Sequence, residues 1–339
     1  MRALRGVAAV ACAMYACASA AGLQAQTTAG PCTLSSSFNG FASQDACTKA
    51  RDIFAFVMPQ VGVALAGGNP VLGEGGTLGG WGKRALSLRV TAVDGNVPAN
   101  AVPIAIGGSA VSSNLGATRV PVPVPSVDAA IGLFAGVPAG LTNVGGVDVL
   151  LGATYLPSVD EQEFSVAPQT SSFAFSYGVR IGALQESSVV PGVSVSYMRR
   201  KLPTTTLGYV AGNDSITVSN LAATSNSLRL VVSKRVAIFG FAGGVGRDQI
   251  ENTAGVNAVV NETVLGQQAQ ARVALSGLRN AVTRNTAFVN LSLGLRMARV
   301  VGELGWAAAG EPDPTTNSFD GKLANDSYRY GSLGITVRF

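Results

Sequence analysis

The sequence contains no histidine among its 339 residues. Ser–His hydrolases, Asp–His proteases and His-dependent acyltransferases would therefore lack their general base here. The four cysteines form no CxxC pair, which argues against a redox or metal site built on them. A calcium-type site made only of Asp and Glu stays open. We expect no enzymatic activity, no metal and no cofactor.

Charged residues are also scarce, at 13% of the chain against about 25% in an ordinary soluble domain. Hydrophobic residues make up 47%, so something other than water must face much of the surface. Beyond the N-terminal segment there is no run of about 20 apolar residues that could span a bilayer as a helix. A closed barrel is then the way in which an exported, apolar chain satisfies its backbone groups in lipid.

Export is indicated by the first residues. Arg2 and Arg5 precede an uncharged, Ala/Val-rich run, and small residues follow at 18–20 and 23–25. This pattern is typical of a secretory signal peptide, and we expect residues 1–25 to be removed. Lipidation at Cys17 is the alternative, although Tyr15 fits a lipobox poorly.

Little basic charge remains after removal of Arg2 and Arg5, because 24 − 2 leaves 22 Lys and Arg against 19 acids. No basic cluster is longer than the triplet 199–201, so we expect no nucleic-acid partner. That triplet fits a strand end in the headgroup zone.

Residues 26–80 precede the expected barrel. Cys32 and Cys47 are predicted to form a disulfide, as is usual for two cysteines in an exported chain. Apolar residues at helical spacing predict a helix from Gln44, which Pro59 should end. The segment fits either a periplasmic cap or a plug inside the barrel.

The last strand is the most informative stretch. Apolar side chains alternate with Gly, Thr and Arg up to a terminal aromatic, which gives one oily and one polar face. It resembles the closing strand of bacterial outer-membrane β-barrels. The resemblance implies an outer-membrane location, with membrane lipid and the barrel-assembly machinery as partners. The expected assembly signal comprises Tyr328, Tyr330, Leu333, Ile335, Val337 and Phe339.

Counting backwards from Phe339, with short periplasmic turns and long external loops, gives ten antiparallel strands in residues 81–339. Two alternating runs, 255–264 and 269–278, form either a hairpin above the membrane or two more wall strands. If this hairpin and the region 207–218 join the wall, the count rises to twelve or fourteen. The alternating prolines of 120–125 should keep that stretch out of any central ladder.

The same parity predicts which charged side chains line the lumen. They fit either a network of Arg–carboxylate pairs that fills a narrow barrel or a positively lined passage that favours anions. The candidates are Arg89, Asp128, Asp148, Arg180, Arg229, Arg296, Glu303 and Arg338.

The capped N-terminus, the Asn-Pro segment at 69–70 and the glycine-rich strands are loosely similar to the barrels that carry fatty acids and other hydrophobic compounds. The resemblance implies passive passage of small hydrophobic solutes, and the arginines of the lumen add anionic ones, so we expect a porin-like transport protein. The alternative is a non-conducting structural or surface-interaction barrel that acts through its long external loops.

Overall fold

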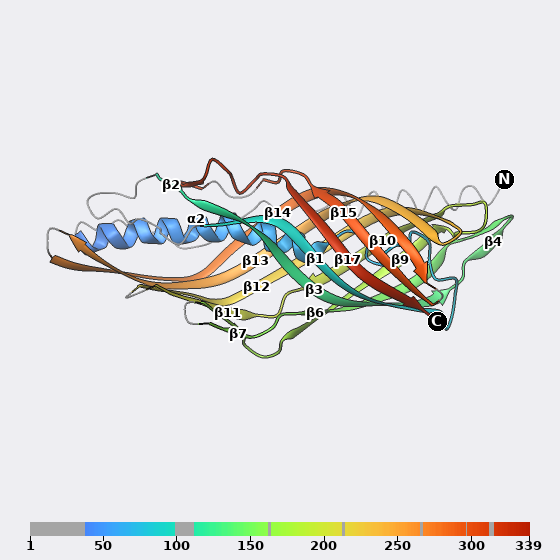
Figure 1. The fold of residues 1–339 in the computed structure, drawn as a ribbon, viewed down its shortest axis with the longest axis horizontal. Coiled ribbons are helices and arrows are strands. Elements are labelled where there is room, and N and C mark those ends of the chain that lie inside the picture. Colours follow the sequence, from blue (N-terminus) through green and yellow to red (C-terminus); the bar gives the residue numbers. More distant parts are fainter. Residues whose placement is uncertain are drawn as a thin grey trace.

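The structure is a computed structural model, and it describes residues 38–98, 112–161, 164–211, 214–264, 267–295, 297–311 and 315–339. Ten long strands form a closed antiparallel ring around one helix, α2 (Phe38–Ala66) (Figure 1). The predicted ten-stranded barrel is therefore confirmed. The ring strands are β1 (Arg84–Pro98), β3 (Ala117–Phe134), β6 (Gly146–Tyr155), β9 (Phe173–Leu184), β10 (Gly192–Lys201), β12 (Asp214–Val236), β13 (Phe239–Val264), β14 (Gln267–Leu295), β15 (Ala298–Ala307) and β17 (Tyr328–Arg338).

The ring closes where its first and last strands meet. β1 pairs with β17 from Ala85↔Arg338 to Val93↔Tyr330. β10 pairs directly with β12, so β11, which lies between them in sequence, is outside the ring. Closure joins the first and last strands of the sheet, whose unpaired backbone groups would be costly in lipid.

The remaining strands are short and lie at the two ends of the ring. Near the external loops, β2 (Asn114–Leu115) pairs in parallel with β16 (Ser318–Phe319), while β7 (Val159–Asp160), β8 (Phe164–Pro168) and β11 (Thr205–Ala211) extend the sheet from β12. At the opposite end, β4 (Val137–Ala139) and β5 (Thr142–Val144) form a small hairpin.

The two ends of the ring differ in the length of their connections. Residues 237–238 join β12 to β13 at one end, where Arg84 and Phe339 also exchange two backbone hydrogen bonds of 3.0 Å. The long connections lie at the other end, on the left of Figure 1. Because short turns face the periplasm in outer-membrane barrels, we call these the periplasmic and the external end.

Side chains alternate across the wall as the sequence of β17 predicts. Leu333 and Ile335 are 67% and 49% exposed, whereas Ser332 and Thr336, which flank them in sequence, are buried. The exposed apolar side chains of the other ring strands include Leu88, Tyr177, Leu230, Phe241, Leu291 and Leu304. An apolar face that points away from the lumen on every side is the arrangement of a barrel in lipid.

Residues 255–264 and 269–278, which were ambiguous in the sequence, belong to β13 and β14 and continue them beyond the ring as a hairpin. Asn220 in β12 and Gly277 in β14 have positive φ angles of 51° and 69°, where the strand registers shift. These are β-bulges, which bend a sheet. We call the part beyond them, 214–219, 256–264 and 267–275, the outer ribbon.

The prolines of 120–125 lie inside β3, and the prediction that they stay out of a central ladder is confirmed. Pro121, Pro123 and Pro125 pair with residues of β1. β6, on the other side of β3, pairs only with residues from Ser126 onward. The proline stretch is thus an edge, where the missing N–H groups interrupt no ladder.

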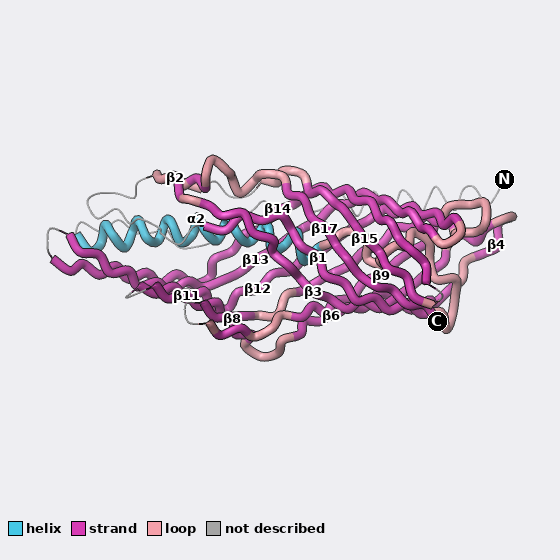
Figure 2. The backbone as a smooth tube through the Cα atoms, in the orientation of Figure 1, coloured by secondary structure: helices cyan, strands magenta, loops and turns pink. Residues whose placement is uncertain are grey.

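Helix α2 runs inside the ring, and Figure 2 shows strands on both sides of it. Phe54, Met58 and Val63 pack with wall residues such as Ile250 and Phe288 in the largest apolar cluster. The helix does not end at Pro59, as predicted, but continues to Ala66. Burial against the wall outweighs the break, and the Gln60 side chain donates to the Phe56 carbonyl at 3.0 Å near it. In the described residues no helix is both long and apolar enough to span a membrane.

Candidate functional site

The lumen is filled by residues 44–80, which we call the plug. Helix α2 supplies its external part, and the helix ends where the N–H of Gly67, in the left-handed region, donates to the Val63 carbonyl. Residues 67–80 then continue toward the periplasmic end, where β1 begins at Arg84. Of the two positions left open by the sequence, a cap or a plug, the structure has the plug.

Glu303 of β15 fixes the chain where it leaves the helix. Its carboxylate accepts the backbone N–H groups of Gly68 and Asn69 at 3.1 and 2.8 Å. The side chains of Asn290 and Ser332 also donate to it, at 2.7 and 3.0 Å. Four hydrogen bonds satisfy a buried charge that would otherwise be expensive.

Two arginines donate hydrogen bonds to the carbonyl groups of the same turn. Arg229 donates to the carbonyl oxygens of Gly67 and Gly68 at 2.8 and 3.2 Å, and it forms an ion pair of 2.6 Å with Asp248. Arg89 donates to the carbonyl of Asn69 at 2.8 Å. Wall charges of both signs therefore bind the plug backbone directly.

Asp128 joins two arginines on one side of the lumen. It pairs with Arg89 at 2.8 Å and with Arg200 at 2.6 Å, and all three side chains are buried. Arg89 belongs to β1 and Arg200 to β10, and the strands β3, β6 and β9 separate them in the ring. The single carboxylate of Asp128 thus binds two guanidinium groups from different parts of the wall.

The periplasmic part of the plug is held by a second set of charges. Asp148, which pairs with Arg180 at 2.7 Å, accepts the backbone N–H of Leu78 at 3.1 Å. Glu74 pairs with Arg338 and Arg299 at 3.1 and 3.3 Å. Of the predicted lumen candidates, Arg296 alone lies outside the described residues.

Sequence reasoning missed several residues of this network. Arg200 was assigned to a headgroup triplet, but it is buried in the lumen and shares the parity of Ser194 and Ser196 in β10. That parity was visible in the sequence. Glu74 and Asp248 could not be found in the same way, because the first is in an irregular segment and the second follows a glycine-rich stretch. Among the described wall residues, the buried arginines are 89, 180, 200, 229 and 284, and the buried carboxylates are 128, 148, 248 and 303. The plug adds the buried carboxylates 45, 52 and 74 and one buried lysine, 49, so carboxylates compensate the predicted arginine excess.

The external half of the helix is tied to the long loops. Asp52 accepts the backbone N–H groups of Thr316 and Asn317 and the amide of Asn317, each at 2.8 Å. Burial raises the pKa of the Asp52 carboxyl, and these hydrogen bonds offset only part of that effect. Phe56 stacks on Phe319 with ring centroids 4.1 Å apart.

The residues of the expected assembly signal in the C-terminal strand lie on two different faces of the wall. Leu333, Ile335 and Phe339 are exposed on the outside. Tyr328 and Tyr330 are buried in the lumen cluster with the helix, and Arg284 lies 4.7 Å from the Tyr328 ring centre. The two tyrosines therefore face the lumen and belong to the same apolar cluster as the plug helix.

The predicted disulfide stays a prediction. Cys47 is buried in α2, close to Ala258 of the outer ribbon. Cys32 and the expected signal peptide lie outside the described residues. In the described part of the chain, no group of three or more Cys, Asp or Glu side chains is placed to hold a metal ion.

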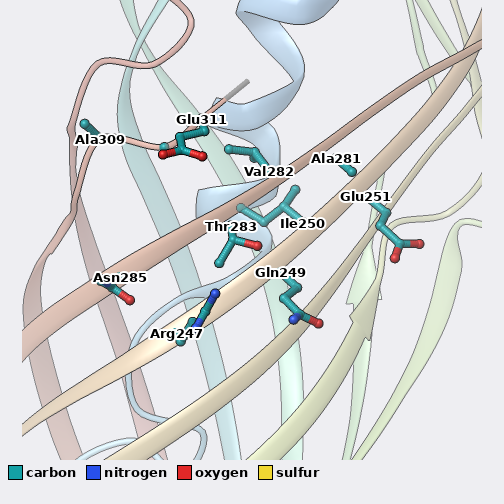
Figure 3. A pocket seen from close by; sticks show the side chains of 11 residues that line it. Arg247, Gln249, Ile250, Glu251, Ala281, Val282, Thr283, Asn285, Ala309 and Glu311 are labelled. Carbon is teal, nitrogen blue, oxygen red and sulfur yellow. The ribbon is translucent and has the colours of Figure 1, made fainter. Parts of the chain in front are cut away.

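Two clefts open on the external part of the wall. The first, of about 510 Å³, lies over β13 and β14 beside residues 309–311 and is lined by Arg247, Gln249, Glu251, Thr283 and Glu311, among others (Figure 3). The second, of about 420 Å³, lies where β1, β3 and β17 end, and its lining includes Asp94, Arg119, Lys322 and Arg329.

Comparisons with known proteins return only distant likenesses. No family model and no curated protein matches the chain. Among solved structures, the translocator domain of the autotransporter NalP from Neisseria meningitidis is 12% identical, with 77% of this chain and 89% of that chain covered and a TM-score of 0.32. The copper transporter OprC is 13% identical, with 77% and 43% covered and a TM-score of 0.27. The anion-selective porin from Comamonas acidovorans is 9% identical, with 76% and 98% covered and a TM-score of 0.17.

These structures are outer-membrane barrels, but the likeness is too distant to carry an argument about function. The closed ring of ten strands and its apolar outer face carry the assignment. The chain is an outer-membrane β-barrel with a helical plug in its lumen.

Proposed function

We propose that this protein is a closed barrel that acts through its external surface rather than through an open pore. The observation that carries the proposal is the plug, which is bonded to the wall along its length. Glu303 and Arg229 hold the turn after the helix, and Asp148 holds Leu78 nearer the periplasm. Because the charged side chains of the lumen are paired with each other and with the plug, few of them are available to bind a passing solute.

The outer ribbon is the surface that the barrel presents. β12, β13 and β14 have 23, 26 and 29 residues, more than the roughly ten that cross a bilayer as a strand. Ala258 of the ribbon packs against Ala46 and Cys47 of α2, so helix and ribbon support each other outside the membrane. A rigid projection of this kind suits contact with another molecule or cell.

Electrical recording tests the closed state. The purified barrel in planar bilayers should show no steady conductance, and proteoliposomes should not swell in isotonic solutions of small anionic or neutral solutes. A steady conductance of the unmodified protein would overturn the proposal and favour a pore.

A ribbon truncation tests the external role. Val256 faces Leu275 across the hairpin, so residues 257–274 can be replaced by an Asn-Gly turn. The ring stays whole in this variant, which should keep the heat-dependent gel migration of a folded barrel. Cells that carry it should lose the cell–cell or cell–surface attachment that the full protein confers. Unchanged attachment would contradict the proposal.

Passage of small hydrophobic or anionic solutes is the second candidate. It is favoured by the chemistry of residues 67–80, whose contacts with the wall include many hydrogen bonds and ion pairs. Four glycines of that segment, 67, 73, 79 and 80, have positive φ angles and give the backbone freedom to rearrange. Solute uptake that is abolished by cross-linking the plug to the wall would support this candidate.

A further inference from the structure

The 420 Å³ cleft at the external ends of β1, β3 and β17 has an unusual position and charge. Asp94 and Asn96 of β1, Arg119 of β3, Arg329 of β17 and Lys322 of the preceding loop line it. Arg119, Lys322 and Arg329 are exposed, so the cationic rim of the cleft lies on the outside of the barrel, while Phe56 of α2 and Tyr328 line its inner side.

The height of the cleft follows from the length of β17. Arg329 lies ten residues before Phe339, the aromatic at the periplasmic end. At about 3.3 Å per residue and a tilt of about 40°, ten residues rise about 25 Å, which is the height of the apolar band of an outer-membrane barrel. Trp306, which pairs with Arg329 and is half exposed, fits the aromatic girdle at that boundary.

Two cations in the cleft make no direct hydrogen bond or ion pair with the described residues, although both lie within the electrostatic reach of Asp94. Arg119 binds Asp94 through both its Nε and Nη2 atoms. Among the described residues, the Lys322 ammonium and the Arg329 guanidinium have no hydrogen-bond or ion-pair partner. The other carboxylate, Asp326, accepts the N–H of Leu323 at 3.1 Å. Three cations therefore face two carboxylates around the cleft.

The wall below the cleft is apolar. Val90 of β1 and Leu333 of β17 are 45% and 67% exposed on the outward face, and Val127 of β3 is exposed as well. The prolines of β3 add a smooth row between Arg119 and Val127. A molecule that fits both regions has an anionic group at the top and hydrocarbon chains beneath it.

We propose that this cleft binds the phosphate group of an outer-leaflet lipid, with its acyl chains against the outward face of β1, β3 and β17. The planar guanidinium of Arg329 is suited to two parallel hydrogen bonds with a phosphate, and Lys322 adds a point charge. The site rests on the position of the barrel in a bilayer, but not on whether its lumen conducts.

The cleft of Figure 3 supplies the matched control. It lies on the external part of β13 and β14 and is larger, but one cation, Arg247, faces two carboxylates, Glu251 and Glu311. The balance of charge is therefore opposite to that of the cleft at the ends of β1, β3 and β17. Arg247→Gln should therefore leave the binding of a phosphorylated lipid unchanged.

The test measures retention of bisphosphorylated lipid A by the detergent-solubilised full-length barrel, using native mass spectrometry. The double variant Lys322→Gln/Arg329→Gln should retain about tenfold less of it than the unmodified protein. Arg329→Lys should keep most of the binding, because the charge remains. Heat-dependent gel migration of each variant verifies that the barrel is folded.

Three results would overturn the inference. The first is equal retention of dephosphorylated lipid A by the unmodified protein, because the phosphate would then contribute nothing. The second is displacement of the lipid by millimolar inorganic phosphate, which would indicate a site for the free anion. The third is an equal loss in Arg247→Gln, which would indicate unspecific attraction. Conductance recorded on the same samples tests the closed lumen separately.

Discussion

The carboxylate of Glu303 accepts the backbone N–H of Asn69 at 2.8 Å, across 234 positions of sequence. This contact joins the second-to-last wall strand to the turn at which the plug leaves its helix. Because the same carboxylate also accepts the N–H of Gly68, it replaces the helical hydrogen bonds that end at Ala66. This wall side chain thus satisfies the N–H groups that are left free at the helix end and is one anchor of the plug.

Removal of this carboxylate should loosen the plug without opening the ring. Glu303→Ala leaves two buried backbone N–H groups and the Asn290 amide without their acceptor, and each buried unsatisfied group costs about 1–3 kcal/mol. We expect a lower temperature for the heat-dependent shift in gel migration and brief current openings in planar bilayers. Glu303→Gln keeps one acceptor oxygen and should lie between the two. An unchanged, silent Glu303→Ala barrel would show that the plug does not depend on this anchor.

Asp128 should be one of the most sensitive positions of the wall. Asp128→Ala leaves Arg89 and Arg200 buried and without their shared carboxylate, and removal of one partner from a buried ion pair typically costs about 3–5 kcal/mol. Urea-induced unfolding in detergent micelles measures the loss. The matched control is Arg119→Ala, which breaks an Arg–Asp pair on the exposed surface and should have no measurable effect.

The wall could be predicted from the sequence, but the contacts of the plug could not. Strand parity identified Arg89, Asp148, Arg180 and Glu303 as one set, because a period of two assigns every residue of a ring strand to one of two faces. Residues 67–80 have no period, so nothing in the sequence related Asn69 to Glu303. Their position depends on hydrogen bonds to strands that come much later in the chain.

The two sets of prolines differ for a physical reason. Local propensity predicts that Pro59 ends the helix, and the surroundings override it, whereas the prolines of β3 lie in a segment that is paired on one side only, as local propensity indicates. A helix enclosed by a barrel tolerates a proline because the wall holds both of its halves, and an edge segment tolerates prolines because one of its sides has no partner. Whether a segment is enclosed or at an edge depends on the closed ring as a whole. A short stretch of sequence does not contain that information.

The link between α2 and the external loop should depend on hydrogen-bond acceptance at Asp52, not on its charge. Burial raises the pKa of this carboxyl above its ordinary 3.8, so the folded chain holds the proton more tightly than the unfolded chain. The stability that Asp52 contributes is therefore fully present below pH 3.8 and is lost as the pH rises through the raised pKa. Asp52→Asn should remove this pH dependence with little loss of stability at neutral pH. Asp52→Ala should expose residues 315–319 to protease; equal cleavage of both variants would contradict this.

The pairing of Cys32 with Cys47 can be tested without a structure of the N-terminal segment. Fourteen residues separate the two cysteines, and closing so short a loop stabilises by about 3 kcal/mol in the chain-entropy model. The outer-membrane form should bind no thiol-alkylating reagent until it is unfolded and reduced. Two alkylated cysteines in the unfolded, unreduced protein would show that the bond is absent.

Gly62 should be required for contact between helix and wall. A Cβ atom at this position would lie 2.2 Å from Cγ2 of Ile250 in β13, well inside contact distance. Gly62→Ala must therefore push α2 away from the wall, and overpacking of this kind costs about 1–3 kcal/mol. We expect faster amide hydrogen exchange in the helix and a lower temperature of the heat-dependent gel shift. Gly302→Ala is the control, because a Cβ there meets no atom within 4 Å on the lipid-facing side of β15. Equal behaviour of the two variants would mean that the helix is not packed against Ile250 at Gly62.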